Sequence, residues 1–212
     1  MTGPTKVLLV DDHAVVREGY LRLLEDEPSI SVVGEASNAV EACERARALA
    51  PDVVVMDIAL PGTSGIEATR RMLKDQPHLR VLMFSMYDDA IYARRALEAG
   101  ALGYLSKASA PEALIRAIYA VARGERYLSE DVATHIARSP DRPGRAQLEA
   151  LSPREFEVLR LLVRGETVRA IGEKLGLSEK TVANHQSAIR EKLGARNSAQ
   201  LARLAAEIGV CG

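Results

Sequence analysis

The sequence has few cysteines, no long apolar run and almost no net charge. Only two of the 212 residues are cysteines, Cys43 and Cys211, and neither has a partner at metal-site spacing. This argues against a disulfide scaffold and favours reduced thiols in a cytoplasmic protein. No run approaches the roughly 18 apolar residues of a membrane span, and the first residues lack the apolar core of a signal peptide. We therefore expect a cytoplasmic protein without a membrane partner.

Charge is balanced over the whole chain but not along it. The 28 basic and 29 acidic side chains nearly cancel. Residues 1–122 hold 13 basic and 17 acidic side chains, whereas residues 148–212 hold 10 basic and 8 acidic ones. An acidic N-terminal part and a mildly basic C-terminal part fit a signalling module joined to an anion-binding module.

The first part of the chain alternates between two periodicities. Short apolar runs, separated by stretches of helical spacing, occupy residues 7–10, 30–33, 53–56, 81–84 and 101–105. Such alternation is typical of βαβ units around a parallel sheet. The runs that are apolar throughout suit strands covered by helices on both faces. Residues 1–122 are therefore expected to form an α/β, doubly wound, five-stranded parallel sheet.

The pattern changes after residue 122. Residues 123–147 are charged and contain Ser-Pro-Asp-Arg-Pro-Gly-Arg (139–145), which predicts a linker. Residues 148–212 show only helical spacing and are expected to form an all-α domain of four helices. Ser152, followed by Pro153 and then Glu155, is a strong helix start. Three glycines are expected to end helices: Gly165, Gly176 and Gly194.

Polar side chains follow the apolar runs of the predicted sheet. Asp11 and Asp12 follow the first run, and Asp57 follows the third. If these two strands are neighbours, three carboxylates converge at the carboxyl edge of the sheet, where ligands bind in such folds. A hard divalent cation with oxygen ligands, such as Mg²⁺, would relieve their repulsion. Ser85 and Lys107 follow later strands and suit a transferred phosphoryl group. Taken singly, each residue fits an ordinary solvated strand end, but all five together favour a site.

These residues stand in motifs that resemble the receiver family of two-component response regulators. The motifs are Val-Asp-Asp-His (10–13), Met-Asp-Ile-Ala-Leu-Pro-Gly (56–62), Phe-Ser-Met (84–86) and Gly-Tyr-Leu-Ser-Lys (103–107). The resemblance implies a flavodoxin-like fold and Asp57 as the phosphoacceptor. It further implies Mg²⁺ held by Asp11, Asp12, Asp57 and the Ala59 carbonyl, phosphoryl contacts from Ser85 and Lys107, and a switch role for Tyr104. Tyr104 equally fits a plain core or rim aromatic.

The last domain has the spacing of a helix-turn-helix. Residues 170–175 are followed by Gly176-Leu177-Ser178 and a second helical stretch, whose first residues would face DNA bases. Asn184 could bind adenine bidentately. The side chains better suited to phosphate contacts are Lys180, Thr181, His185 and Arg190. The exposed face opposite Val182, Ile189 and Leu193 would further include Ala183 and Ser187, and Ser178 would cap the helix. A solvated face in an interaction domain is the open alternative.

A second resemblance concerns this domain. Residues 151–165, 177–185 and 189–194 resemble LuxR-type DNA-binding domains, so the whole chain resembles the NarL/FixJ class of regulators. Ala183 stands where the family often has lysine, which suggests weaker binding or an unusual base preference. In this family the last helix also pairs two protomers, which implies a dimer surface at Leu201, Leu204 and Ile208; these residues could instead pack on their own domain.

We therefore expect a response regulator rather than an enzyme, with Mg²⁺-dependent phosphoryl acceptance and autodephosphorylation as its only chemistry. A sensor histidine kinase would phosphorylate Asp57, and this would control homodimerisation and binding to double-stranded DNA. Three alternatives stay open: an atypical regulator that binds DNA without phosphorylation, a phosphatase-like enzyme, and a protein-interaction module. The phosphatase would need a second acid at the position of Ala59.

Overall fold

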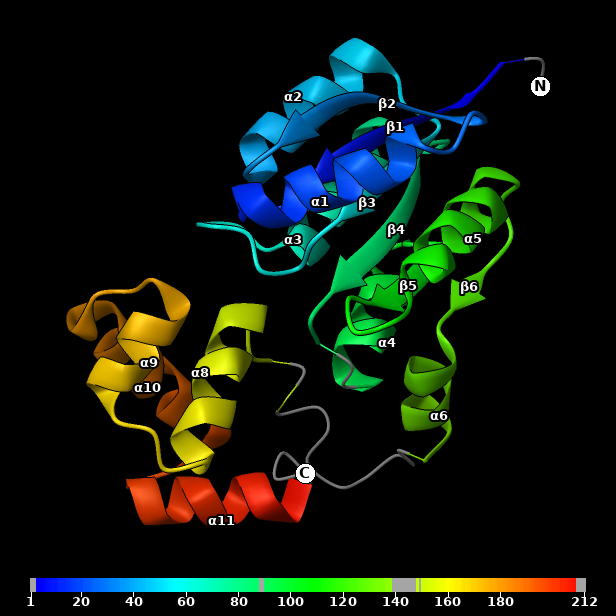
Figure 1. Cartoon of the computed structure of the whole chain (residues 1–212). Helices are drawn as coiled ribbons and strands as arrows, with labels where there is room; N and C mark the ends of the chain where they lie inside the picture. The colour runs from blue at the N-terminus through cyan, green and yellow to red at the C-terminus, as the bar shows by residue number, and fades with distance from the viewer. Residues whose placement is uncertain (1–2, 88–89, 139–147, 149, 209–212) are drawn as a thin grey trace. The chain divides into compact units, whose positions relative to one another are not determined.

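The computed structural model describes residues 3–87, 90–138, 148 and 150–208, and the chain divides into two compact units, Met1–Ser139 and Pro140–Gly212 (Figure 1). The first unit alternates strands and helices in the order β1 (Thr5–Val10), α1 (Ala14–Glu25), β2 (Ile30–Ala36), α2 (Ala39–Leu49), β3 (Val53–Met56), α3 (Gly65–Asp75), β4 (Arg80–Ser85), α4 (Ala90–Glu98), β5 (Gly103–Ser106), α5 (Pro111–Ala122), β6 (Tyr127–Leu128) and α6 (Glu130–Arg138). Among the described residues, no helix is both long and apolar enough to cross a membrane.

The strands form one parallel sheet in the order β2-β1-β3-β4-β5-β6. β1 and β3 are neighbours, as the convergence of their carboxylates required. Val10 pairs with Met56, and Met56 pairs with Met83. Because all strands run the same way and end at similar heights, the residues after β1, β3, β4 and β5 meet at one edge of the sheet.

Both faces of the central strands are buried. Alternate residues such as Val7, Val55 and Leu82 pack against α1 and α5, together with Leu24 and Leu114. The residues between them face the opposite side, towards α2 and α3: Leu8, Val10, Val54, Met56, Val81 and Met83. Full burial of such a side chain contributes about 1.5–3 kcal/mol. This two-sided burial explains why the runs are apolar throughout rather than alternating.

The sheet has six strands rather than the five expected. β6 pairs with β5, and α6 follows it within residues 123–147, which were expected to be a linker. Val132 on α6 is fully buried. A strand of two residues is too short to show periodicity, and its charged neighbours resemble a loop, so the pairing with β5 leaves no signal in the sequence. The rest of the expected linker, residues 139–147, lies outside the described residues.

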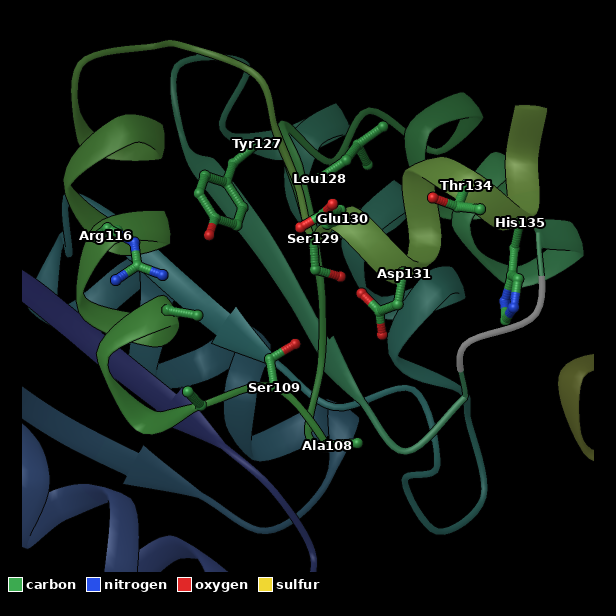
Figure 2. Close-up of a pocket in the computed structure, with 12 residues that line it drawn as sticks. Ala108, Ser109, Arg116, Tyr127, Leu128, Ser129, Glu130, Asp131, Thr134 and His135 are labelled. Carbon is green, nitrogen blue, oxygen red and sulfur yellow. The ribbon is translucent and has the colours of Figure 1, made fainter. Parts of the chain in front are cut away.

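β6 and α6 form a groove together with α5 (Figure 2). The groove has a volume of about 780 Å³, and Arg116, Asp131 and Ser129 are among the residues that line it. Ser129 stands directly before α6 and is only 6% exposed. Within the described residues, its hydroxyl oxygen has no hydrogen-bond partner.

The second unit contains, within residues 150–208, the helices α8 (Pro153–Val163), α9 (Val168–Leu175), α10 (Glu179–Leu193) and α11 (Ser198–Ile208). The helix start predicted at Ser152 is confirmed. Its side chain accepts from the Glu155 amide, while the Glu155 carboxylate accepts from the Ser152 amide. Left-handed Gly176 and Gly194 end α9 and α10. The buried core of this unit includes Phe156, Leu159, Ile171, Val182, Ile189, Leu193 and Leu201.

Candidate functional site

Asp11 and Asp57 lie side by side at the carboxyl edge of the sheet. They are 3% and 4% exposed, respectively. The Asp57 amide donates to the Val10 carbonyl, so the β1–β3 ladder continues to the point where both carboxylates emerge. Gly65, the first residue of α3, approaches this place closely, since a Cβ there would lie 1.8 Å from the Asp57 carbonyl oxygen. Only glycine allows α3 to start so close to Asp57.

Lys107 bridges the two buried carboxylates. Its Nζ lies 2.5 Å from Asp11 Oδ2 and 3.1 Å from Asp57 Oδ2, and its side chain is only 5% exposed. Burial raises the pKa of Asp57, and the charge of Lys107 opposes this rise. Burial would lower the pKa of Lys107, but the carboxylates of Asp57 and Asp11 outweigh it, so that pKa is raised. The bridge therefore keeps Lys107 charged and limits the rise in the pKa of Asp57 that burial causes.

A group that could hold a metal ion lies beside this bridge. It consists of Asp11, Asp12 and His13, whose ligand atoms lie within 4.8 Å of one another. His13 Nδ1 is 2.7 Å from Asp12 Oδ1. Two carboxylates at the end of a strand offer the oxygen ligands that Mg²⁺ prefers, so the donor set fits this ion. The structure thus brings Asp11 and Asp12 together, while Asp57 is joined to Asp11 through Lys107.

Arg17 on α1 secures the loop that carries the acidic pair. Its Nη1 donates to the Asp11 carbonyl at 2.7 Å, and its Nε donates to Glu35 on β2 at 3.1 Å. Neither Arg17 nor His13 was among the residues predicted for the site. His13 stands inside the Val-Asp-Asp-His motif and Arg17 one helical turn later, so their spacing from Asp12 was the available signal.

Ser85 and Tyr104 both hold Tyr87, which lies in the loop between β4 and α4. Ser85 Oγ accepts from the Tyr87 amide at 3.3 Å, and the Tyr104 hydroxyl donates to the Tyr87 carbonyl at 2.6 Å. Ser85 and Tyr104 are fully buried, and the Tyr87 ring stacks on Tyr92. The Lys107 amide donates to the Ser85 carbonyl. The β4–α4 loop is therefore connected through Ser85 to the residues around Asp57, and through Tyr87 to the buried Tyr104.

Helix α10 presents a polar face opposite its buried stripe. Val182, Ile189 and Leu193 are buried, as their spacing predicts. The exposed side chains among those expected to contact DNA belong to Ser178, Lys180, Ala183, Asn184 and Ser187. Those of Thr181, His185 and Arg190 are half-buried. The eight residues therefore divide into an outward group and a flanking group.

Two polar contacts fix α10 and the turn before it. Lys192 Nζ binds both carboxylate oxygens of Glu155 on α8, at 2.7 and 2.9 Å. Arg154 donates to the Leu175 carbonyl at the end of α9. The pKa of Glu155 is lowered because hydrogen bonds from Lys192 and Ser152 outweigh the effect of its burial. These contacts hold the helix-turn-helix against α8.

His185 lies on the side of α10 that faces α8. Burial lowers its pKa, and the positive charges of Arg154 and Lys192 act in the same direction, while Glu155 opposes them. A half-buried imidazole whose pKa is lowered is a weaker partner for phosphate than the exposed Lys180.

The residues expected at a dimer surface are divided by burial. Leu201 is only 3% exposed and packs within its own unit, where α11 contacts α8 and α10. Leu204 is half-buried. The side chain of Ile208 lies outside the described residues.

Comparisons with known proteins cover nearly the whole chain. A profile of response regulator receiver domains matches residues 7–119, and one of bacterial regulatory proteins of the luxR family matches residues 149–205. Response regulator UvrY of Escherichia coli O6:H1 is 39% identical over 97% of this chain and 95% of its own length. Response regulator GacA of Pseudomonas syringae is 38% identical over 97% of each chain.

A solved structure extends the comparison to DNA. RcsB of Salmonella enterica serovar Typhimurium, bound to promoter rprA in the presence of phosphomimetic BeF₃⁻, is 26% identical to this chain. It matches with a TM-score of 0.61 over 96% of this chain and 99% of that one.

Proposed function

Because this chain belongs to the response regulators of the NarL/FixJ class, with a receiver domain and a LuxR-type DNA-binding domain, we propose that phosphorylation of Asp57 by a sensor histidine kinase controls its dimerisation and its sequence-specific binding to DNA. The family consists of regulators and not of classical enzymes. The proposal places the protein in the cytoplasm with its DNA. The observation that carries it is the buried Asp11–Lys107–Asp57 bridge.

The proposed chemistry is one phosphoryl transfer. An Asp57 carboxylate oxygen attacks the phosphorus of a phosphohistidine, the phosphorus–nitrogen bond breaks, and the electron pair leaves with the imidazole nitrogen. Lys107 supports this step in two ways: its charge favours the ionised nucleophile, and it offers a cation to the phosphoryl oxygens. Water later attacks the acyl phosphate, which releases phosphate and restores the carboxylate.

We assign a magnesium ion to Asp11, Asp12, Asp57 and the carbonyl of Ala59, where its charge would offset that of the phosphoryl oxygens. The proximity of Asp11 and Asp12 supports this assignment. Arg17 fixes the loop after β1 by its hydrogen bond to the Asp11 carbonyl. This bond would hold the Asp11 and Asp12 carboxylates in position even when no metal ion neutralises their charge.

We propose that phosphorylation of Asp57 alters the surface of the first unit by changing the contacts of Tyr87. A phosphoryl group on Asp57 adds about 1.5–2 negative charges and new acceptor oxygens. The Ser85 hydroxyl now accepts from the Tyr87 amide, and a bond from that hydroxyl to the phosphoryl group would change this contact. Because Tyr104 donates to the same residue, the β4–α4 loop and Tyr104 would move together. A local change in charge thus biases a two-state surface.

The DNA-binding part of the proposal rests on α10. Its exposed N-terminal half follows a Ser-capped helix start, which suits contact with phosphate and with base edges. Two copies of such a helix match two half-sites, so we propose a homodimer on DNA. Of the three residues expected at a dimer surface, Leu204 is the one whose described side chain is partly exposed, because Leu201 is buried in its own unit and the side chain of Ile208 lies outside the described residues.

The first test measures phosphorylation directly. The full chain is incubated with acetyl phosphate and Mg²⁺, and the phosphorylated fraction is read from a phosphate-affinity gel. We expect Asp57→Asn to abolish the shifted band. Asp75→Asn is the matched control, since this carboxylate only pairs with Arg47 at the surface, and it should behave as wild type. A shifted band in Asp57→Asn would exclude Asp57 as the acceptor.

The second test measures control of DNA binding. DNA is selected from a random pool, and its affinity for wild type and Asp57→Asn is measured with and without beryllofluoride and Mg²⁺. We expect wild type to bind at least tenfold more tightly with beryllofluoride and the variant to be indifferent to it. Equal affinities in all four combinations would instead favour a regulator that binds DNA without phosphorylation.

A further inference from the structure

The polar side chains of α10 differ in whether their hydrogen-bonding groups are already used. Ser178 Oγ accepts from the Thr181 amide and shares a hydrogen bond with Thr181 Oγ1. Ser187 Oγ donates to the Ala183 carbonyl, and Arg190 Nε donates to the Gln186 carbonyl. The hydroxyls of Ser178, Thr181 and Ser187 stabilise the helix itself, which reduces what they can offer to a base edge. Arg190 is half-buried and keeps its other guanidinium donors, which suit a phosphate contact.

Asn184 is in a different situation. Its side chain is exposed, and within residues 150–208 no hydrogen bond or ion pair engages its amide. An amide offers one acceptor and a donor pair, and this combination matches the N6 and N7 atoms of adenine in the major groove.

Ala183 lies beside Asn184 on the exposed face. Its methyl group cannot donate or accept a hydrogen bond, so it can distinguish bases only by apolar contact. In the major groove, the C5-methyl group of thymine is the one apolar feature that a base edge presents.

We propose that direct base recognition by α10 is confined to Ala183 and Asn184, which read a thymine methyl group and a neighbouring adenine, while the other polar residues of α10 only position the helix on phosphates. The inference rests on the proposed function and deepens it by naming the bases. Lys180, one turn before Asn184, is exposed and supplies a phosphate contact.

The charge along α10 supports this confinement to its N-terminal half. Glu191 is exposed and lies two turns after Asn184, on the same side of the helix. A carboxylate there repels DNA phosphates. The two proposed readers are adjacent residues whose Cα atoms are about 3.8 Å apart, which is close to the spacing of about 3.4 Å between base pairs. The thymine and the adenine should therefore lie in the same or adjacent base pairs of each half-site.

The decisive experiment changes the DNA and leaves the protein intact. Sequences are selected from random DNA with the full chain and beryllofluoride, and each selected thymine is then replaced by deoxyuridine, which lacks only the methyl group. We expect one thymine per half-site to weaken binding about three- to fivefold on replacement. Replacing the neighbouring adenine by 7-deazaadenine, which lacks N7, should weaken binding about 5- to 50-fold. Thymines elsewhere serve as controls and should have no effect.

Protein variants assign these effects to residues. Asn184→Ala should lose its adenine preference in a repeated selection, and Ala183→Ser should lose its sensitivity to deoxyuridine. Lys180→Gln is the matched control: it should weaken all sequences alike and reduce the salt dependence, without changing the selected sequence. Glu191→Gln should tighten binding to all sequences alike. Circular dichroism establishes that each variant is folded.

The outcomes distinguish a wrong assignment of bases from a failure of the proposed function in DNA binding. If wild type selects and binds DNA, but deoxyuridine has no effect or Asn184→Ala selects the wild-type sequence, the base assignment is wrong and DNA binding stands. If wild type retains no DNA even at low salt, both the proposed function and this inference are overturned.

Discussion

Each unit of the molecule contains a lysine that binds buried carboxylates, and the two lysines lie in different surroundings. The side chain of Lys107 is 5% exposed and sits between two aspartates that are equally buried. The side chain of Lys192 is 37% exposed and binds Glu155 from the solvent side. Water screens the second pair and leaves the first almost unscreened. Similar ion pairs can thus hold a reactive centre in one unit and secure a helix in the other.

The largest effect is expected when Lys107 is removed. Lys107→Met leaves two buried carboxylates facing each other without a cation, and breaking a buried pair in this way costs about 3 kcal/mol. Hydrogen exchange, measured by mass spectrometry on peptides from β1 and β3, should show this loss in the first unit only. Added Mg²⁺ should recover part of it, because the ion binds the folded carboxylates.

Lys74→Met is the control for this change, since Lys74 is an exposed lysine on α3 of the same unit. It should alter the exchange free energy by less than about 0.5 kcal/mol. A loss below about 1 kcal/mol in Lys107→Met would mean that the carboxylates do not depend on the lysine, and the contrast with Lys192 would disappear.

A smaller and pH-dependent effect is expected at Lys192. Lys192→Met should destabilise the second unit by about 1 kcal/mol at pH 7, because its pair with Glu155 is partly solvated. The pKa of Glu155 is lowered in the folded protein, so its contribution is present above the ordinary glutamate pKa of 4.5 and is lost as the pH falls through the folded value. The difference between wild type and variant should therefore shrink as the pH falls below 4.5 and vanish once the pH is below the lowered pKa of Glu155 in the folded protein.

The check is hydrogen exchange of α8 and α10 peptides, compared between wild type and Lys192→Met after correction for the intrinsic rate at each pH. A constant difference from pH 7 to pH 3 would show that Lys192 acts through packing of its aliphatic stem rather than through charge.

The last comparison concerns two serines that precede helices, where the expected effects are no larger than about 1 kcal/mol. Ser152 completes a capping box before α8, so Ser152→Ala should cost the second unit about 1 kcal/mol. Ser129 precedes α6 with its hydroxyl buried and, among the described residues, without a partner. Ser129→Ala should therefore leave the first unit equally stable or stabilise it by up to about 1 kcal/mol. Opposite signs in hydrogen exchange support this view, whereas equal losses would show that the Ser129 hydroxyl also caps its helix.

Much of the first unit could be predicted because its local signals agree. Fully apolar runs indicate strands buried on both faces. The polar residues that follow these runs indicate that the site lies at the carboxyl edge of the sheet. β6 could not be predicted, since two residues carry no periodicity and are ordered by pairing with β5. In the second unit the capping residues and glycines mark the helix ends directly. The half-buried position of His185 was not visible, because it depends on how α10 packs against α8.

The sequence by itself determined which chemical groups are present, where the helices begin and end, and that both faces of the sheet are covered, since these follow from local spacing and backbone preference. Only the tertiary structure decided that Lys107 bridges Asp11 and Asp57, that Arg17 secures the loop that carries Asp11, and that Lys192 binds Glu155. These outcomes depend on distances between side chains far apart in the chain. Such distances are set by how helices pack on one particular sheet order, and no local pattern encodes them.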